Sequence, residues 1–400
     1  MSTLLVTATG PDRPGAVVRL LEAAARPGAE VLDVEQAVVR GRLSLAVRLR
    51  TGTDGQPSAE ALTAVGRELG LHVTCEAATG EEVPEPLTRL HVAVLGSPLG
   101  AGALADVVRR LADHGGTVQR VRRLAGEPVT CVELDVSGDV SGGMDLLTVR
   151  RDLAVRAASL GVDVAVTPAG LERRSRRLVV LDVDSTLIRQ EVVELLAAHA
   201  GRAAEVAAVT ERAMRGELDF AASLHQRVTW LAGLDAAVLD DVRRAVRLTD
   251  GARTLVDTLH RLGFPVGLVS GGFAEVVEPL AADLGVRHVR ANRLEVRGGR
   301  LTGRVTGPVV DRAGKAAALR EMAAAEGVPM SSTVAVGDGA NDLDMLAAAG
   351  LGVAFCAKPL VREQADAVLS QPYLDTVLHL LGIPRDEFAP HPDPHPRPPS

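Results

Sequence analysis

The sequence contains almost no lysine. Lys315 and Lys358 are its only two, and arginine carries nearly all of the positive charge. Arginine presents its hydrogen-bond donors in a planar fork, whereas lysine is a compact point charge. We therefore expect the two lysines to stand at positions that need a point charge. The formal net charge is −7, which favours solubility and argues against a surface for nucleic acid or for an anionic membrane.

Cysteines and long apolar runs are scarce too. Cys75, Cys131 and Cys356 lie far apart, without a CxxC pair or histidines at zinc-ligand spacing. We expect reduced core residues of a cytoplasmic protein. Arg, Asp or Gly interrupts every apolar stretch before the roughly 18 residues that a membrane helix needs. No basic segment followed by an apolar run stands at the start, which argues against a signal peptide.

The sequence does contain material for several domains. Its 400 residues are 46% hydrophobic and 24% charged, as in a globular chain with more than one core. Residues 1–79 and 87–168 share the pattern strand, helix, strand, strand, helix, strand, and residues 80–86 have linker composition. A repeated βαββαβ pattern predicts two ferredoxin-like domains.

The pattern changes after about residue 171. Continuous apolar runs at 177–184, 264–270 and 332–338 end in polar residues. Such runs, separated by long helical segments, predict an α/β domain over 174–383 with a parallel sheet buried on both faces. The first two runs lie about 80 residues apart, more than one crossover helix requires, so we expect a helical insertion at about 190–255. The Pro-rich end, 384–400, is predicted to be disordered.

Polar motifs follow the first two apolar runs. Asp182 and Asp184 lie within the sequence Asp-Val-Asp-Ser-Thr. Ligands of open α/β sheets bind beyond the carboxyl ends of strands, and paired carboxylates there suit a hard cation. A turn that caps the next helix is the structural alternative. Ser270-Gly271-Gly272 offers a hydroxyl and backbone N–H groups to a phosphoryl oxygen, although Ser-Gly-Gly also forms ordinary turns.

Two later elements have related chemistry. Lys315 stands at the start of a predicted helix and suits a phosphate, the alternative being a solvated surface lysine. The third run is followed by Gly-Asp-Gly-Ala-Asn-Asp, which contains Asp338 and Asp342. Carboxylates supply the hard oxygen ligands that magnesium prefers, and glycine lets the backbone approach closely.

In this order, the four motifs resemble those of the haloacid dehalogenase superfamily of phosphatases. The resemblance implies a Rossmann-like parallel sheet with a helical cap, Asp182 as nucleophile, and Asp184 as general acid and base. It implies a Mg²⁺ ion held by Asp182, the carbonyl oxygen of Asp184, Asp338 and Asp342. The residues that it implies for substrate binding in these motifs are Ser270, Gly271, Lys315 and Asn341.

The predicted insertion carries a second resemblance. Its pattern T-x-x-A-M-x-G-x-x-x-F-x-x-S-L-x-x-R-V, over 210–228, is similar to the cap of bacterial phosphoserine phosphatases. That similarity implies that Glu191 meets the substrate ammonium, that Arg227 meets its carboxylate, and that Met214 and Phe220 close the pocket. A guanidinium matches a carboxylate with two hydrogen bonds. The alternative is that both charges are solvated on amphipathic helices.

Each N-terminal repeat resembles an ACT domain, a small regulatory fold that binds amino acids at paired interfaces. The first carries Gly-Pro-Asp-Arg-Pro-Gly at 10–15, which implies a regulatory site at Gly10, Asp12 and Gly15. The second repeat has Gly-Ser-Pro-Leu at 96–99 and lacks the Asp-Arg pair. Exposed sheet edges favour pairing between chains, so we expect a homodimer. L-serine is the expected effector; alternatively, the repeats only dimerise the protein.

Two ACT units before such a phosphatase resemble the long actinobacterial phosphoserine phosphatases. The resemblance implies hydrolysis of O-phospho-L-serine through an aspartyl-phosphate, the last step of serine biosynthesis. A phosphatase or phosphotransferase for another phosphorylated amino acid is an alternative. An amino-acid-sensing binding protein is another, but the complete set of catalytic residue types speaks against it.

Overall fold

The computed structural model describes residues 2–25, 29–51, 59–78, 88–138, 144–170, 175–214 and 219–389. The chain divides into two compact units, Met1–Glu85 and Pro86–Ser400. The predicted linker at 80–86 lies outside the described residues.

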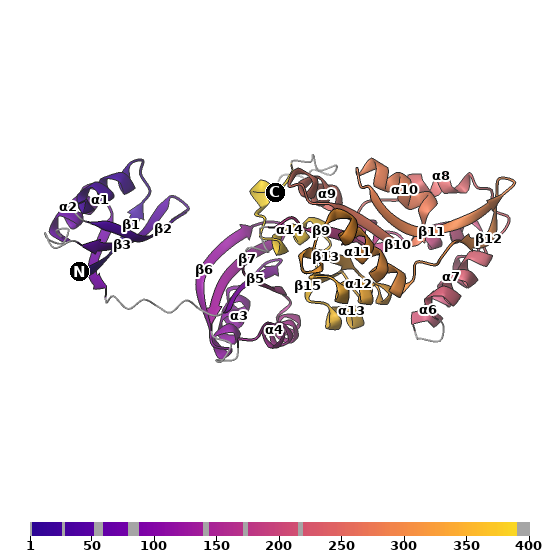
Figure 1. Cartoon of the computed structure of the whole chain (residues 1–400), viewed down its shortest axis with the longest axis horizontal. Coiled ribbons are helices and arrows are strands. Elements are labelled where there is room, and N and C mark those ends of the chain that lie inside the picture. The colour runs from indigo at the N-terminus through magenta and orange to yellow at the C-terminus, as the bar shows by residue number, and fades with distance from the viewer. Residues whose placement is uncertain are drawn as a thin grey trace. The chain divides into compact units, whose positions relative to one another are not determined.

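The first unit is a four-stranded antiparallel sheet with two helices (Figure 1). Its elements are β1 (Ser2–Pro11), α1 (Ala16–Ala24), β2 (Glu30–Val39), β3 (Arg42–Thr51), α2 (Ala59–Leu69) and β4 (His72–Ala78), in the sheet order β2-β3-β1-β4. Alternate residues of a strand point to the same face. Leu4 and Val6 of β1 are therefore buried together, with Leu20 of α1 and Leu62 of α2.

The second unit begins with a repeat of this arrangement. Its elements are β5 (Thr88–Gly96), α3 (Ala101–Asp113), β6 (Gly116–Ala125), β7 (Thr130–Gly138), α4 (Leu146–Leu160) and β8 (Asp163–Pro168). Val92 and Val94 of β5 share a core with Val107 of α3 and Leu153 of α4. Ala93 and Leu95, on the other face of β5, belong to the hydrophobic core of the α/β part of the unit, which follows β8 in sequence. The two predicted ferredoxin-like units are confirmed, and the second shares a core with the rest of its unit.

The remaining residues alternate between strands and helices. The strands are β9 (Leu178–Leu181), β10 (Val266–Phe273), β11 (His288–Arg297), β12 (Arg300–Thr306), β13 (Thr333–Gly337), β14 (Leu351–Phe355) and β15 (Ala367–Leu369). The helices are α5 (Val192–His199), α6 (Ala203–Met214), α7 (Phe220–Thr229), α8 (Val238–Ala245), α9 (Ala252–Arg261), α10 (Ala274–Asp283), α11 (Arg312–Glu326), α12 (Leu343–Ala348), α13 (Pro359–Gln364) and α14 (Val377–Leu380).

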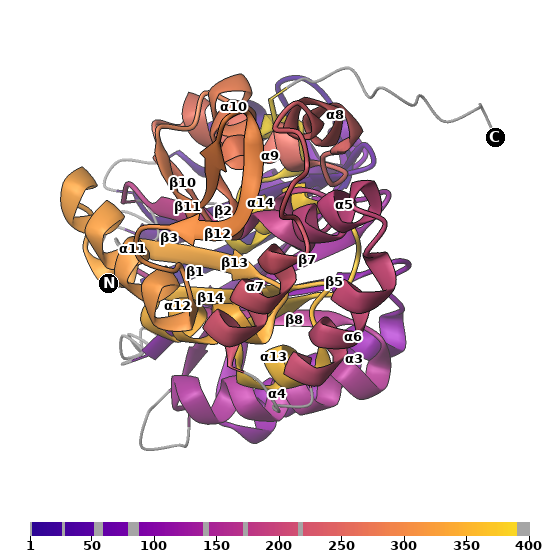
Figure 2. The same cartoon turned by 90° about the vertical axis from the view of Figure 1, so that its right-hand side faces the viewer.

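Six of these strands form the predicted parallel sheet, in the order β11-β10-β9-β13-β14-β15. Leu178 and Val180 of β9 pack with α11 and α12 on one face. Val179 and Leu181 pack with α9, α10 and α14 on the other. Figure 2 shows this layering around β13 and β14. Burial on both faces explains why these strands are continuously apolar.

The helical insertion and the first part of the unit join this sheet at different places. Helices α5 to α8 form the insertion between β9 and β10, and Leu234 and Leu301 link it to the β11–β12 hairpin through main-chain hydrogen bonds. At the other edge, β15 pairs with β8 in antiparallel orientation, Ala367 opposite Ala165. The second ferredoxin-like sheet therefore continues into the parallel sheet as one eleven-stranded sheet.

Two predictions are corrected by the structure. Cys356 is exposed and has a backbone φ of 44°, so it is not a core residue, unlike the buried Cys131. The prediction of disorder from residue 384 is wrong for residues 384–389, which the structure describes. Phe388 stacks on His379 with ring centroids 4.9 Å apart, and the N–H of Ala389 donates to Thr258 Oγ1 at 2.9 Å. One buried aromatic side chain thus holds the start of a Pro-rich segment; residues 390–400 lie outside the described chain.

None of the helices in the described part of the chain combines the length and apolar character that a membrane crossing requires.

Candidate active site

The polar motifs meet at the carboxyl edge of the parallel sheet. Leu181 of β9 lies opposite Leu268 of β10 and Val336 of β13. The residues that follow therefore lie close together, and the N–H of Asp182 donates to the carbonyl oxygen of Val336 at 2.9 Å. A cavity of about 900 Å³ opens over this edge, between the sheet and the helical insertion.

Lys315 lies between two carboxylates beneath this cavity. Its Nζ atom is 2.6 Å from Asp182 Oδ1 and 2.6 Å from Asp342 Oδ1, and its side chain is fully buried. Burial alone would lower the pKa of Lys315, but Asp182 and Asp342 outweigh it and raise that pKa, so the ammonium keeps its proton. A compact point charge suits this place between two carboxylates, and the contact of Lys315 with a phosphoryl oxygen stays a prediction.

Asp184 occupies a different environment from Asp182. Its Oδ1 accepts from the N–H of Val192 at 3.0 Å, and Ser270 Oγ lies 3.4 Å from its Oδ2. Burial, and then the charge of Glu191, raises the pKa of Asp184 to about 7. A carboxyl group with that pKa carries a proton much of the time near neutral pH, as a general acid must.

Two glycines let the segment 270–272 lie close to Phe220 and Asp184. A Cβ atom on Gly271 would lie 2.7 Å from Phe220 Cζ, and one on Gly272 would lie 2.5 Å from Asp184 Oδ2. Either side chain would displace a group at the cavity. The N–H of Gly272 donates to Ser270 Oγ at 2.8 Å, which fixes that hydroxyl.

The acidic residues fit a divalent cation. Asp182, Asp338 and Asp342 each present a carboxylate oxygen within 4.8 Å of the others. Burial and then neighbouring carboxylates raise the pKa of Asp338 to about 7, and the pKa of Asp182 rises for the same reasons, although Lys315 opposes it. One ammonium does not balance these carboxylates, and an all-oxygen donor set is the one that Mg²⁺ prefers.

The insertion brings one acid and one base to the opposite wall of the cavity. Glu191 Oε1 accepts from Ser185 Oγ at 2.7 Å. Arg227 Nε donates to the carbonyl oxygen of Ser223 at 3.3 Å, one turn earlier on α7. Burial lowers the pKa of Arg227, whereas Glu191, Asp184 and Glu194 act to raise it. The site therefore presents a half-buried guanidinium close to a carboxylate, above the carboxyl edge of the sheet.

The structure gathers nearly all of the predicted site residues around this cavity. Those that line it are Asp182, Asp184, Glu191, Phe220, Arg227, Gly271, Asp338 and Asn341. Ser270, Lys315 and Asp342 lie directly behind them through the contacts given above. Met214 ends α6, and its side chain lies outside the part of the chain that the structure describes.

Two residues that hold the site in place, Asn292 and Thr249, belong to none of the sequence motifs. The Asn292 side chain donates to the carbonyl oxygen of Gly271 at 2.8 Å and accepts from the N–H of Val310 at 2.8 Å. Thr249 Oγ1 donates to the carbonyl oxygen of Thr186 at 2.7 Å. Both act between segments far apart in sequence, where local patterns give no signal.

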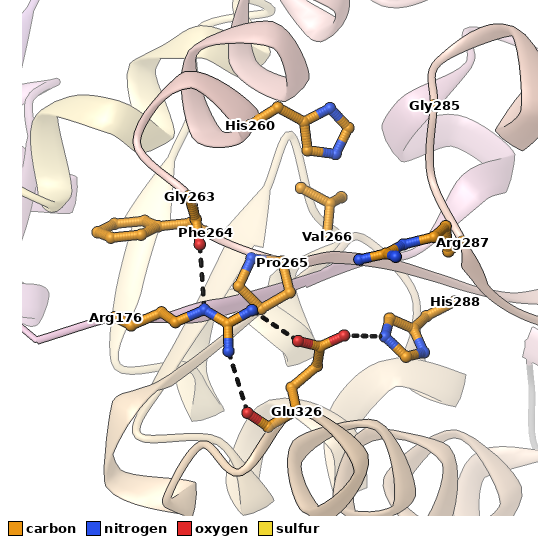
Figure 3. A pocket seen from close by; sticks show the side chains of 10 residues that line it. All are labelled: Arg176, His260, Gly263, Phe264, Pro265, Val266, Gly285, Arg287, His288 and Glu326. Atoms are coloured by element: carbon orange, nitrogen blue, oxygen red, sulfur yellow. Dashed lines mark hydrogen bonds and ion pairs between the residues drawn. The ribbon is translucent and has the colours of Figure 1, made fainter.

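A second cavity, of about 440 Å³, has a structural role (Figure 3). It lies at the amino end of β10, beside Pro265 and Val266, away from Ser270. Arg176 donates to the carbonyl oxygens of Gly263 and Glu326, both at 3.1 Å, and pairs with the Glu326 carboxylate at 2.7 Å. Its donors are occupied, so Arg176 ties the segment before β9 to its neighbours.

The predicted regulatory turn has its own structural reasons for glycine. Gly15 precedes α1 with φ 81°, a conformation that side chains disfavour. A Cβ atom on Gly10 would lie 2.7 Å from the carbonyl oxygen of Gly70. Asp12 is exposed, and only its main-chain N–H is bonded, to the carbonyl oxygen of Gly41 at 2.8 Å, among the interactions of the described residues. Of the three predicted residues, Asp12 alone presents a functional group to solvent.

Comparisons with known proteins agree with this architecture. Residues 179–347 match the haloacid dehalogenase-like hydrolase family, and residues 2–76 and 89–167 each match an ACT domain family. The chain is 54% identical to a phosphoserine phosphatase of Streptomyces coelicolor over 96% of its own length and 93% of the relative's. It is 51% identical to a phosphoserine phosphatase of Mycobacterium tuberculosis over 96% and 94% of the two chains.

Solved structures show the same likeness. A phospho-aspartyl intermediate analogue of phosphoserine phosphatase is 39% identical, with a TM-score of 0.50, and covers 51% of this chain and 98% of that chain. A probable phosphoserine phosphatase from Vibrio cholerae is 34% identical, with a TM-score of 0.57, over 73% and 86%. The chain therefore belongs to the phosphoserine phosphatase family of haloacid dehalogenase-like hydrolases, in the form that carries two ACT domains.

Proposed function

We propose that this protein hydrolyses O-phospho-L-serine to L-serine and phosphate through an aspartyl-phosphate intermediate. One observation carries the choice of substrate: a half-buried Arg227 lines the same cavity as Glu191 and Asp182. A guanidinium and a carboxylate complement the carboxylate and ammonium of an amino acid. The relatives named above, similar over nearly the whole chain, support the same substrate.

In the first step, a carboxylate oxygen of Asp182 attacks phosphorus and the bond from phosphorus to the serine oxygen breaks. Asp184 gives its proton to that oxygen, and its raised pKa supplies the proton near neutral pH. Ser270, Lys315 and the N–H of Gly271 stabilise charge on the phosphoryl oxygens.

In the second step, Asp184 takes a proton from water, whose oxygen attacks phosphorus and releases Asp182. Splitting one difficult hydrolysis into two displacements is the advantage of a carboxylate nucleophile. Asp182, Asp338, Asp342 and the carbonyl oxygen of Asp184 would hold Mg²⁺, which neutralises phosphate charge and lets a carboxylate approach.

The comparison of substrates tests this proposal. We expect kcat/KM for phosphoserine to exceed that for phosphothreonine and phosphohomoserine, because Phe220 closes a pocket around a short side chain. Equal or higher values for another phosphorylated amino acid would favour the alternative substrate. Failure to hydrolyse any of them, with amino acids still bound, would favour an amino-acid-sensing protein.

The same proposal includes a homodimer that senses L-serine through the ACT domains. Strand β2 is an edge strand, and Val31, Val34, Val38 and Val39 on it are exposed, which favours pairing with a second chain. Asp12 offers an acceptor to an amine. Effector coupling of this kind typically changes affinity by about 1–3 kcal/mol.

Point variants test serine sensing better than truncation, because β8 continues into the phosphatase sheet. We expect Asp12→Ala to weaken the response of the full chain to serine. Glu60→Ala, at an exposed position on α2 of the same domain, is the control and should leave the response unchanged. If serine inhibits only by competing with phosphoserine, and to the same degree in both variants, all serine binding belongs to the catalytic cavity.

A further inference from the structure

Among the contacts between the second ACT domain and the phosphatase is one buried carboxylate at the start of β8. Asp163 is 6% exposed. Its Oδ2 accepts from the main-chain N–H of Ser370 at 2.7 Å, and its Oδ1 accepts from Ser370 Oγ at 2.8 Å. Arg362 of α13 donates to the same hydroxyl at 3.1 Å. Both oxygens of Asp163 therefore fix the residue that follows β15.

From Ser370 the contacts lead to a strained segment. The N–H of Cys356 donates to the carbonyl oxygen of Leu369 at 2.8 Å, and its thiol lies 3.7 Å from the carbonyl oxygen of Ser370. Cys356 has φ 44°. Residues with side chains hold such a conformation only where their surroundings impose it. Here β15 and Ser370 make the contacts that hold Cys356.

The segment 356–358 ends beside the cavity at the carboxyl edge of the parallel sheet. The N–H of Lys358 donates to the carbonyl oxygen of Asp338 at 3.3 Å, and Lys358 lines the catalytic cavity. On its other side, the Asp338 carboxylate accepts from Thr186 Oγ1 at 3.3 Å. A second contact also connects the ACT domain with the phosphatase. Arg150 of α4 pairs with Asp366 at 2.5 Å, and Asp366 accepts from the N–H of Gly352 at 2.9 Å.

We propose that Asp163, a residue of the second ACT domain, is a positioning residue of the phosphatase: through Ser370 and Cys356 it holds the 356–358 segment against the main chain of Asp338. The proposal rests on the proposed function of Asp338 as a metal ligand. It gives the second ACT domain a direct route to the metal site. Residues behind metal ligands typically change metal affinity or activity about 10- to 100-fold.

Asp163→Ala tests the proposal in the full chain, and Asp106→Ala is the matched control. Asp106 lies in the same domain, is 9% exposed, and pairs with Arg156 at 2.6 Å without touching β15. We expect Asp163→Ala to weaken Mg²⁺ binding at least threefold, measured by calorimetry without substrate, and to lower kcat for phosphoserine. KM should stay within twofold, because Glu191 and Arg227 are untouched. Asp106→Ala should change neither quantity, whatever its melting temperature.

Conservative variants separate positioning from simple folding. Asp163→Asn keeps an acceptor for the Ser370 N–H and should restore most of the Mg²⁺ affinity. Ser370→Ala removes the hydroxyl contact and keeps the main-chain N–H contact, so it should weaken Mg²⁺ binding measurably but less than Asp163→Ala. The double variant should be no worse than Asp163→Ala, because both changes act through one contact. If Asp163→Ala does not fold, Ser370→Ala carries the test.

Mg²⁺ affinity and kcat equal to those of Asp106→Ala would overturn the proposal. A wild-type protein without activity on phosphoserine would contradict the proposed function and still leave the calorimetric test intact.

Discussion

The side-chain amide of Asn292 donates to the carbonyl oxygen of Gly271 at 2.8 Å. Asn292 is 2% exposed, and its amide oxygen also accepts from the N–H of Val310, shortly before Lys315 and its helix α11. One buried side chain thus connects the segment that carries Ser270 and Gly271 with the segment that leads to Lys315.

We expect Asn292→Ala to lower kcat/KM about 10- to 100-fold, like other losses of a residue that orients a site. The effect should be equal for phosphoserine and p-nitrophenyl phosphate, because both present a phosphoryl group. The buried N–H of Val310 would lose its acceptor, at a cost of about 1–3 kcal/mol of stability. Thr258→Val is the control: Thr258 is also buried and bonded, but to Ala389, and its loss should reduce stability alone. A selective loss on phosphoserine would contradict this role of Asn292.

The metal site predicts a specific response to cations. EDTA should abolish turnover and Mg²⁺ should restore it, because the carboxylates of Asp182, Asp338 and Asp342 lie close enough together to bind one divalent cation. Ca²⁺ should inhibit, since its larger and looser coordination shell disturbs the attack geometry. Steady-state rates in metal-depleted buffer measure this. Full activity in a metal-free preparation would be incompatible with the proposed site.

The two charges in the insertion should govern selectivity. Arg227→Ala and Glu191→Ala are expected to raise KM for phosphoserine about 10- to 150-fold, from the roughly 1.5–3 kcal/mol of a charged hydrogen bond. They should affect p-nitrophenyl phosphate much less, because it has neither amine nor carboxylate. Arg202→Ala is the control: Arg202 is exposed just before α6 and pairs with Glu205 at 2.7 Å. Equal losses on both substrates would mean that these residues only shape the cavity.

His379 should make stability depend on pH. It is 2% exposed, bonds through Nδ1 to the carbonyl oxygen of Ile383 at 2.9 Å, and burial lowers its pKa below 6.5. Between the two pKa values, His379 is therefore protonated in the unfolded chain and neutral in the folded chain. The contribution of His379 to the free energy of unfolding is therefore fully present above about pH 6.5. Below that pH the contribution decreases by at most about 1.4 kcal/mol per pH unit. His379→Gln should flatten this dependence in denaturant unfolding between pH 5 and 7.5. An unchanged slope would show that His379 does not cause it.

The sequence was most informative where chemistry coincides with strand ends. Asp182, Ser270 and Asp338 each follow an apolar run, and parallel strands bring such positions together. Asp163 and Asn292 could not be predicted in this way, because their partners lie 207 and 21 or 18 residues away. Only the folded arrangement of β8 beside β15, and of β11 beside β10, creates those contacts. Cys356 was misjudged because its left-handed backbone, imposed by its neighbours, leaves the residue exposed.

Trapping the phosphorylated protein tests the central claim most directly. Wild-type protein mixed with ³²P-labelled phosphoserine and quenched in acid should carry label, and peptide mapping should locate it on Asp182. Asp182→Asn should carry no label and show no turnover, because an amide does not form the acyl phosphate. Label on another residue, or full turnover by Asp182→Asn with deamidation excluded by mass spectrometry, would contradict the proposed mechanism.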